Sequence, residues 1–162
     1  MIKEINCDIF EAPIDVLGHC CNCFNTMGGG IALEIAKRYP KVKEVDSKTI
    51  KGDKNKLGTV SMVSIGDSRY IANMYGQYQY GIENRHLNYE SFYSCLKELD
   101  YACETRTINV SKIGLPYKIG CGSAGGSWKI VREMIYDVFE NSNKKLYICK
   151  NTFVINIKDR EF

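Results

Sequence analysis

Residues 16–32 read Val16-Leu17-Gly18-His19-Cys20-Cys21-Asn22-Cys23-Phe24-Asn25-Thr26-Met27-Gly28-Gly29-Gly30-Ile31-Ala32, and the rest of the chain can be interpreted outward from them. The stretch begins with apolar residues, as a buried strand does, and then becomes small and polar up to three consecutive glycines. A helix is predicted over residues 31–39, because Ile31, Ile35 and Tyr39 recur at steps of four. The predicted order is therefore strand, glycine-rich loop and helix.

Such a loop has two properties that suit a phosphate or a diphosphate. Glycine lacks a Cβ atom and tolerates positive φ, so backbone N–H groups can crowd around a ligand. The start of the following helix adds unpaired N–H donors and the positive end of the helix dipole. We therefore expect an anion-binding loop here, while a strand–helix turn that only needs flexibility is the alternative.

The length and composition of the chain limit the classes of protein to which it can belong. Its 162 residues predict a single domain over residues 1–162 with a substantial core. A net charge of +3 argues against a nucleic-acid binder built on a basic patch, and no apolar run approaches the roughly 20 residues that span a bilayer. Residues 1–8 do not resemble a signal peptide, so we expect a cytoplasmic monomer without nucleic-acid or membrane partners, whose eight cysteines stay reduced.

The segment His19-Cys20-Cys21-Asn22-Cys23 raises the question of a metal, because it places a C-x-x-C pair beside a histidine. A structural zinc site usually needs a second ligand pair of similar spacing, and the later cysteines stand alone in the sequence. A redox-active C-x-x-C would open a helix, whereas this helix begins later, at the glycines. We therefore expect no metal and no cofactor.

The remaining sequence alternates between strand-like and helix-like segments. Strands are expected at residues 2–6, 15–21, 59–65, 69–74, within 108–115, at 145–149 and, as a further candidate, at 153–157. Helices are expected at residues 31–39, 41–51, 89–105 with Asn88 as cap, and 128–140. The basic segment 51–56 is expected to be solvated, and the tyrosine-rich loop 75–85 is either a binding element or an ordered surface loop. Interleaved strands and helices predict an α/β fold with a mixed sheet and helices on both faces.

A second glycine-rich loop, Ile119-Gly120-Cys121-Gly122-Ser123-Ala124-Gly125-Gly126-Ser127-Trp128, precedes the last expected helix. Its Gly120-x-Gly122-x-x-Gly125 spacing matches the dinucleotide fingerprint. That motif also needs an acid near the next strand end, and the candidates here, Asp137 and Glu140, fall inside the helix. No G-x-x-x-x-G-K-[ST] motif is present. Two glycine loops, one early and one late, fit better as two sides of a clamp on one diphosphate.

These motifs together resemble the macro domain family. The resemblance rests on residues 22–32, on Arg38-Tyr39-Pro40-Lys41, on the Gly120–Gly126 loop before Trp128 and on Asp8 after the first strand, and it extends over nearly the whole chain. It is greatest to the small stand-alone ADP-ribose-1″-phosphate phosphatases (Appr-1″-p processing proteins). The terminal ADP-ribose protein glycohydrolase subfamily is a near neighbour. The resemblance implies a three-layer α/β/α macro domain with a mixed central sheet that binds ADP-ribose or a derivative.

The resemblance also implies which residues contact the ligand. Asp8 would accept the adenine amino group, with a backbone contact from Ile9, and Asn22 would hold the distal ribose. The loops around the distal ribose and the diphosphate would be Met27, Gly28, Gly29, Gly30 and Ile31 on one side and Gly120, Cys121, Gly122, Ser123, Ala124, Gly125 and Gly126 on the other. Asn151 or Phe153 would border the adenine.

For catalysis, the resemblance points to His19 beside Asn22. In phosphatase-like members a histidine at this place is proposed to act as nucleophile or general base toward a terminal phosphate. A neutral histidine that ties the loop by a hydrogen bond is the alternative. The sequence does not choose a general acid among Asp8, Asp67 and the tyrosines of the 75–80 loop.

The resemblance implies three alternative functions. The first is a phosphatase that hydrolyses ADP-ribose-1″-phosphate to ADP-ribose and phosphate. The second is a non-catalytic reader or sequestering protein for nucleotides that contain ADP-ribose. The third is a protein de-ADP-ribosylase, although the lysine and aspartate of the glycohydrolase subfamily fall here on Tyr75-Gly76 and Ala124, which lack that chemistry.

Overall fold

The computed structural model describes residues 1–105 and 110–151. Its strands are β1 (Ile2–Ile5), β2 (Val16–Cys20), β3 (Val60–Gly66), β4 (Arg69–Met74), β5 (Lys112–Pro116) and β6 (Lys145–Cys149). Its helices are α1 (Gly30–Arg38), α2 (Pro40–Ser47), α3 (Tyr89–Thr105) and α4 (Trp128–Phe139), with a short 3₁₀ helix η1 (Lys54–Lys56). This order confirms the α/β class expected from the sequence.

The described strands form a mixed sheet with the order β1-β6-β5-β2-β4-β3. Neighbouring strands are parallel except β3 and β4, which form an antiparallel hairpin across Asp67 and Ser68. Both turn residues have positive φ, 51° and 57°, as a two-residue type I′ turn requires. The parallel pairing brings the carboxyl ends of β1, β2, β4, β5 and β6 to the same end of the sheet.

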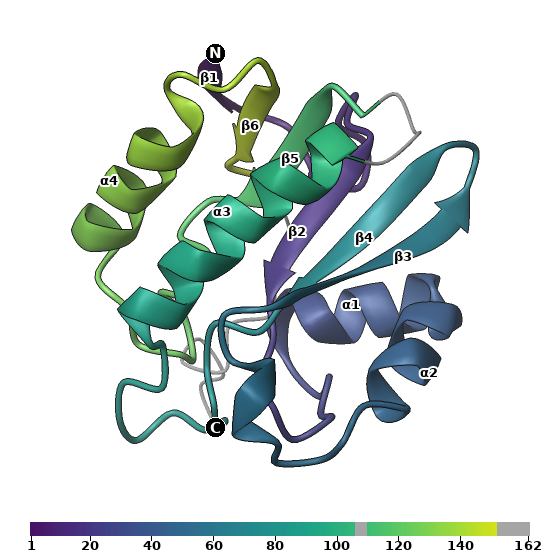
Figure 1. Cartoon of the computed structure of the whole chain (residues 1–162), viewed down its shortest axis with the longest axis vertical. Helices are drawn as coiled ribbons and strands as arrows, with labels where there is room; N and C mark the ends of the chain where they lie inside the picture. The colour runs from purple at the N-terminus through teal and green to yellow at the C-terminus, as the bar shows by residue number, and fades with distance from the viewer. Residues whose placement is uncertain (106–109, 152–162) are drawn as a thin grey trace.

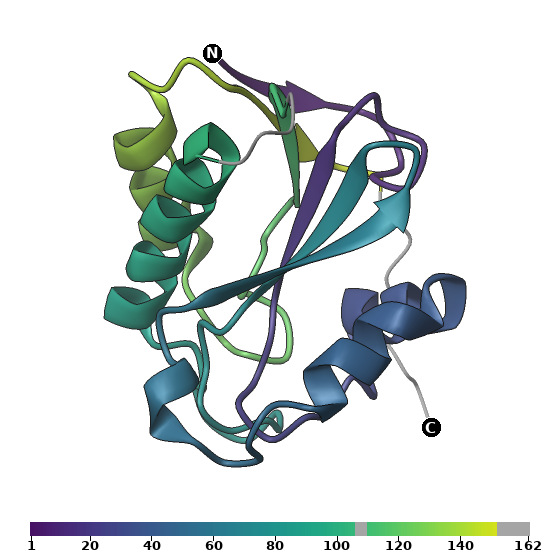
Figure 2. The same ribbon diagram turned by 45° about the vertical axis from the view of Figure 1, so that its right-hand side comes forward.

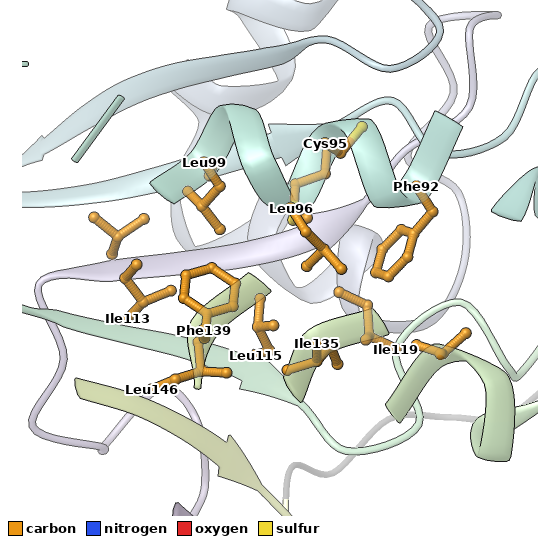
Figure 3. Close-up of a cluster of buried hydrophobic side chains, with 14 of the residues drawn as sticks. Phe92, Cys95, Leu96, Leu99, Ile113, Leu115, Ile119, Ile135, Phe139 and Leu146 are labelled. Carbon is orange, nitrogen blue, oxygen red and sulfur yellow. The ribbon is translucent and has the colours of Figure 1, made fainter. Parts of the chain in front are cut away.

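Helices cover both faces of this sheet. α3 and α4 pack together on one face, and α1 and α2 lie together on the other (Figures 1 and 2). In the larger core cluster, Phe92 and Leu96 of α3 and Phe139 of α4 meet the strand residues Ile113 and Leu115 (Figure 3). Burial of such side chains is the main force that holds the layers together. The three-layer α/β/α architecture is therefore confirmed.

The other face of the sheet has its own core. Ile35 of α1 and Val42 of α2 pack in a second buried cluster with Leu17 of β2 and Ile71 of β4. Both faces of β2 are thus covered, and every one of its residues up to His19 is buried. A strand covered on both sides lacks the alternation of apolar and polar residues that marks a half-exposed strand.

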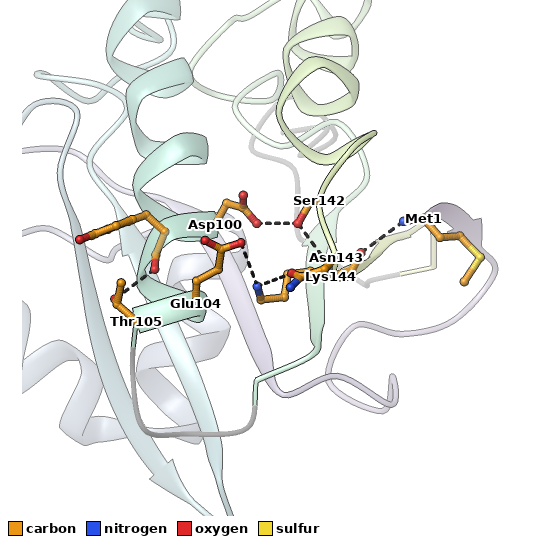
Figure 4. Close-up of polar contacts among 8 residues, drawn as sticks. Met1, Asp100, Glu104, Thr105, Ser142, Asn143 and Lys144 are labelled. Carbon is orange, nitrogen blue, oxygen red and sulfur yellow. Dashed lines mark hydrogen bonds and ion pairs between the residues drawn. The ribbon is translucent and has the colours of Figure 1, made fainter.

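The end of the sheet where β6 begins is closed by polar contacts around the buried Lys144 (Figure 4). The amino group of Met1 donates to the Lys144 carbonyl oxygen at 3.2 Å, and the Lys144 Nζ lies 3.7 Å from Glu104 Oε1. Ser142 Oγ donates to Asp100 Oδ1 at 2.7 Å. These contacts tie β1 and the loop before β6 to the end of α3, on the side of the sheet away from the strands' carboxyl ends.

Some expected boundaries were wrong. The helix expected at 41–51 is α2, which begins at Pro40, a residue suited to a first helical turn because it has no N–H to donate. Pro116 was expected to stop β5 and instead forms its last residue. The segment 51–56, expected to be solvated, contains η1 and ends at the buried Lys56. Residue 108 and the candidate strand 153–157 lie outside the described residues.

Candidate functional site

A cavity of about 900 Å³ opens at the carboxyl ends of the strands, among the loops that follow β2, β4, β5 and β6. Open α/β sheets hold their ligands at this end. The described lining consists of Cys20, Cys21, Asn22, Thr26, Gly28, Gly29, Gly30, Ile31, Ala32, Gln77, Tyr80, Gly81, Ile82, Pro116, Tyr117, Lys118, Ile119, Gly120, Cys121, Gly122, Ser123, Ala124, Cys149 and Lys150. The two glycine loops therefore border one cavity. Met27, Gly125 and Gly126 are not part of this lining.

The first glycine loop presents unpaired amides at the start of α1. Gly29 is the N-cap, and Gly30 has a φ of 56°, a value that favours glycine. In the described part of the chain, the N–H groups of Gly28 and Gly29 donate to no protein acceptor, and the first amides of a helix have no carbonyl one turn before them. Throughout α1, which is fully described, no acidic residue lies in the first turn, so the positive end of the dipole is not compensated there.

The second glycine loop folds back on itself and leaves a further run of free amides. The Gly126 N–H donates to the Gly120 oxygen at 2.9 Å, and positive φ values of 71° at Gly120 and 73° at Gly125 allow the tight path. Between them, the N–H groups of residues 122–124 have no acceptor among the residues that the structure describes. Consecutive free amides of this kind can form a concave site for an anion.

Asn22 lines the cavity, but most of its amide is engaged within its own loop. Its Nδ2 donates to the Thr26 oxygen at 3.1 Å and to Thr26 Oγ1 at 2.7 Å, and its Oδ1 accepts the Phe24 N–H at 2.9 Å. A primary amide has two N–H donors and two acceptor positions on oxygen. Asn22 can therefore shape the loop and still accept a hydrogen bond from one ligand hydroxyl.

Asp8 and Ile9 follow β1, next to the end of β6, and are not part of the described cavity lining. Asp8 Oδ1 accepts the Phe10 N–H at 3.0 Å, so this carboxylate caps the turn after β1. Ile9 is fully buried. Asn151 is exposed at the end of the described chain, and Phe153 lies outside it.

His19 does not line the cavity. Its ring is fully buried on β2, where Nε2 lies 2.7 Å from Asn73 Oδ1 on β4 and 3.5 Å from Cys21 Sγ. Burial lowers the pKa of His19 to about 4, so the imidazole is neutral at physiological pH. This placement favours the structural alternative over a role as nucleophile or general base.

The tyrosine-rich loop contributes to the cavity, but through a different part than Tyr75. Gln77, Tyr80 and Ile82 line the cavity. The Tyr75 side chain instead turns inward, and its hydroxyl donates to Asp46 Oδ1 at 2.7 Å. Of the two alternatives for this loop, the binding element has the better geometric support.

Tyr117, Lys118 and Lys150 also line the cavity, and the sequence reasoning missed all three. Each stands just after a strand whose carboxyl end faces the cavity, Tyr117 and Lys118 after β5 and Lys150 after β6. Their position after strands predicted to be parallel is the signal that could have found them.

The described cavity lining contains no Asp, Glu or His side chain. Burial raises the pKa of the Cys20 thiol to about 12 and that of the Cys121 thiol to about 11, so both stay protonated at neutral pH. The eight cysteines are free thiols, and within residues 1–105 and 110–151 no three His, Cys, Asp or Glu side chains are arranged to hold a metal ion. None of the helices described is long and apolar enough to cross a bilayer. The site thus offers amides, hydroxyls and ammonium groups, with no strong base.

Comparison with known proteins finds relatives of this chain. The family model described as Macro domain matches residues 19–135. An uncharacterized 17.5 kDa protein from the tk-vs intergenic region of Enterobacteria phage T4 is 35% identical over 147 residues, which cover 87% of this chain and 91% of that protein. The ADP-ribose glycohydrolase OARD1 of Homo sapiens is 28% identical over 91% of this chain and 90% of its own length.

Two further similarities support more limited conclusions. An ADP-ribose 1″-phosphate phosphatase of Aspergillus oryzae is 50% identical over 40 residues, which are 24% of this chain and 20% of that protein. The solved macrodomain of Mycobacterium tuberculosis DarG matches with a TM-score of 0.77 at 20% identity, over 94% of this chain and 99% of that chain. The first is a local similarity, and the second shows the fold.

Proposed function

The chain belongs to the macro domain family, and from that premise we propose that it binds ADP-ribose and related nucleotides and hydrolyses ADP-ribose-1″-phosphate to ADP-ribose and phosphate. Relatives named as ADP-ribose glycohydrolase and as ADP-ribose 1″-phosphate phosphatase support a hydrolase of this general kind. The observation that carries the proposal is the pair of free amide runs, at residues 28–32 and 122–124, that border the same cavity.

The diphosphate is the part of the ligand that these amides suit. A diphosphate has several acceptor oxygens and its negative charge is spread over them, so many weak donors can replace a few cations. The positive end of α1 adds to the attraction without a lysine. A chain with a net charge of only +3 is compatible with such a site.

The two ends of the cavity differ, and the difference gives the bound nucleotide a direction. One end adjoins the carboxyl end of β6, next to which Asp8 lies after β1. The other end adjoins β2 and β4, where Asn22 and Gln77 line the cavity. We place the adenosine toward Asp8, because a carboxylate can accept from the adenine amine, and the distal ribose toward Asn22.

Hydrolysis of ADP-ribose-1″-phosphate can proceed without an acidic or basic side chain of the protein. Water attacks C1″ while the C1″–O bond breaks; the water oxygen becomes the anomeric hydroxyl, and its spare proton passes to solvent. Phosphate departs as HPO4²⁻ from the form of the ester whose phosphate carries one proton, so no side chain has to act as general acid, and the free amides at the start of α1 stabilise the charge of the leaving group. Such a route suits a cavity whose described lining offers neither a carboxylate nor an imidazole.

That same lack of an acid or a base favours a second candidate, a protein that binds an ADP-ribose nucleotide and leaves it intact. A de-ADP-ribosylase that works through a lysine has less support. A Cβ atom at Gly76 would lie 2.9 Å from Phe92 Cδ2 and 3.1 Å from Cys20 Sγ, so the expected lysine position has no room for a side chain. The matching aspartate position is Ala124, which has no polar group on its side chain.

Phosphorus NMR of the protein with ADP-ribose-1″-phosphate in ¹⁸O-labelled water tests the proposal. We expect inorganic phosphate to appear over hours while both diphosphate signals persist, and we expect that phosphate to carry no ¹⁸O because the C1″–O bond breaks. Labelled phosphate would mean that the P–O bond breaks and would remove the C1″ step. Shifted diphosphate signals without turnover would favour the second candidate, and unperturbed signals would reject both.

A Gly28→Val variant is the matched control for this experiment. Gly28 lines the cavity, and a Cβ atom at this position meets nothing within 4 Å, so we expect the added side chain to enter cavity space. The variant should fold as the wild type does and release no phosphate. Release at the wild-type rate would show that the reaction does not occur in this cavity.

A further inference from the structure

We infer that the β6 end of the cavity carries a second anion subsite, in which Lys118 and Lys150 flank Tyr117 and accept a phosphate monoester on the adenosine ribose of the bound nucleotide. The inference rests on the proposed function for the direction of the nucleotide, with its adenosine toward β6. A 2′-phosphate and a 3′-phosphate share this chemistry, and the test below separates them.

The two lysines converge on the same aromatic ring. The Lys118 Nζ lies 5.5 Å and the Lys150 Nζ 5.6 Å from the centre of the Tyr117 ring. The Tyr117 N–H donates to the Cys149 oxygen at 3.0 Å, which holds the segment after β5 against the end of β6. All three residues line the cavity. Both ammonium groups therefore lie near one ring, and the backbone hydrogen bond fixes the two strand ends from which the lysines extend.

The backbone at Lys118 is in a conformation that lysine rarely adopts. Its φ is +58°, and its carbonyl oxygen accepts the Cys121 N–H at 2.9 Å in the turn after β5. The other non-glycine residues with positive φ in the described part are Asn25, Asp67 and Ser68, of which the first two belong to types that tolerate it well. Glycine would suit position 118 better, so the strain points to a use for the lysine side chain.

The charges around this end of the cavity leave a positive excess. Glu4 is shared by Lys150, at 2.8 Å, and Arg132, at 3.4 Å. Lys118 forms no ion pair with any carboxylate in residues 1–105 and 110–151. Arg132 also pairs with Glu133, at 3.8 Å, so among the described residues two carboxylates face three cations. A phosphate can therefore bind beside Lys150 in addition to Glu4, and beside Lys118, which has no carboxylate partner there.

The diphosphate is not the anion that we expect Lys118 and Lys150 to bind. The free amides of residues 28–32 and 122–124 already suit a diphosphate, whereas Lys150 and Tyr117 follow β6 and β5 at the adenosine end. At that end, ADP-ribose offers only neutral ribose hydroxyls and the adenine base. A phosphate on the 2′ or 3′ hydroxyl supplies the missing negative charge, and the Tyr117 ring beside it can contact the ribose or the base.

Isothermal titration with 5′-AMP, adenosine 2′,5′-bisphosphate and adenosine 3′,5′-bisphosphate tests the subsite. We expect the wild type to bind one of the bisphosphates about 10-fold more tightly than 5′-AMP, as two charge-assisted contacts would give. The bisphosphate that gains identifies the 2′ or the 3′ position. In Lys118→Gln and in Lys150→Gln the preference should shrink to about 3-fold or less. Lys97→Gln is the matched control, because the Lys97 Nζ lies 4.6 Å from the Tyr93 ring outside the cavity lining, and it should keep the wild-type preference.

Equal binding of all three probes by the wild type, or an unchanged preference in Lys118→Gln, would overturn the subsite. A parallel titration with ADP-ribose separates this failure from that of the proposed function. If ADP-ribose binds and neither bisphosphate gains, only the subsite is wrong. If a Lys118-dependent preference is found and ADP-ribose does not bind, the subsite stands and the proposed function is wrong. If no probe binds, both are wrong.

Thermal unfolding tests whether the strained backbone at Lys118 is linked to the function of its side chain. Lys118→Gly and Lys118→Ala both remove the ammonium group, but only glycine accepts the positive φ without strain. We expect Lys118→Gly to melt at a higher temperature than Lys118→Ala and the wild type, while both variants lose the bisphosphate preference. A lower melting temperature for Lys118→Gly than for the wild type would show that the lysine supports the fold, and would overturn the reading of the strain as functional.

Discussion

The Nε2 atom of His19 on β2 lies 2.7 Å from the Oδ1 atom of Asn73 on β4, inside the protein, and neither residue is part of the cavity lining. The two residues are direct neighbours in the parallel register of these strands. A histidine held in this way has two consequences. It cannot meet a ligand in the cavity as long as β2 and β4 stay paired, and it makes the stability of the fold depend on pH.

The first prediction is that the protein loses stability between about pH 6.5 and pH 4, because burial lowers the pKa of His19 to about 4. Over this range His19 binds a proton in the unfolded chain but not in the folded chain. The free energy of unfolding should therefore fall by up to about 1.4 kcal/mol per pH unit, or about 3 kcal/mol in total, from this group. Urea unfolding measured at intervals from pH 4.5 to pH 7.5 checks the slope.

Two variants isolate this effect. His19→Gln removes the titrating group and should flatten the slope, while His86→Gln changes the only other histidine and should leave the slope as in the wild type. Equal slopes in the wild type and His19→Gln would show that another group controls the pH dependence. A phosphatase rate that survives in His19→Gln would support the view that His19 takes no part in the chemistry.

The second prediction concerns the buried pair Tyr75 and Asp46. The Tyr75 hydroxyl donates to Asp46 Oδ1 at 2.7 Å, and Asp46 is almost fully enclosed. Tyr75→Phe removes the donor and leaves a buried carboxylate with one hydrogen bond fewer, which should lower the free energy of unfolding by about 2–3 kcal/mol. Chemical denaturation of both proteins at one pH measures the difference.

Tyr78→Phe provides the comparison for this pair. The Tyr78 hydroxyl donates to the Gly52 carbonyl oxygen at 2.8 Å, a neutral acceptor in a partly buried place. Its loss should lower the free energy of unfolding by about 1 kcal/mol. If Tyr75→Phe and Tyr78→Phe lower the free energy of unfolding by the same amount, the charge on Asp46 does not determine the loss of stability.

The third prediction links the buried Lys56 to the ligand loop. The Lys56 Nζ donates to Asn25 Oδ1 at 2.7 Å and to Thr49 Oγ1 at 2.9 Å. Asn25 has a φ of 59° and stands three residues after Asn22, in the loop that leads to α1. Lys56→Met should lower the free energy of unfolding by about 2 kcal/mol and weaken ADP-ribose binding, because the loop loses an anchor. Lys54→Met, at an exposed neighbouring position, should change neither quantity by a comparable amount.

Much of the architecture could be predicted from the sequence because its signals are local. Three consecutive glycines between an apolar run and an i, i+4 pattern specify a loop that opens a helix. The alternating segment around Gly66 and Arg69 specifies a hairpin. These patterns depend on the conformational limits of the residues themselves and not on distant partners.

The surroundings of His19 and Lys56 were predicted wrongly because they depend on long-range packing, which a local sequence pattern does not show. His19 was interpreted as a possible catalyst because it is a polar residue at a strand end, yet β2 is covered on both faces and encloses it. Lys56 was expected to be solvated because its segment is basic, yet its ammonium group donates to Asn25, which lies 31 residues earlier in the chain, and to the nearer Thr49. Asn73 for His19 and Asn25 for Lys56 are partners far away in the sequence, so local composition alone suggests exposure.

The last prediction separates the ligand-binding role of the second glycine loop from its packing role. At Gly122, a Cβ atom would meet nothing within 4 Å, whereas at Gly126 it would lie 2.5 Å from Leu87 Cδ2 and 2.7 Å from the Gly120 oxygen. Gly122→Val should therefore keep the wild-type melting temperature and lower the affinity for ADP-ribose at least about 10-fold, since its side chain occupies cavity space beside the free amides of this loop. Gly126→Val should instead lower the melting temperature, because a backbone oxygen and a core leucine must move. Scanning calorimetry and titration of both variants give the two readouts. Full affinity in Gly122→Val would mean that the ligand does not approach this loop, and the diphosphate clamp would have to be abandoned even if the protein still bound ADP-ribose.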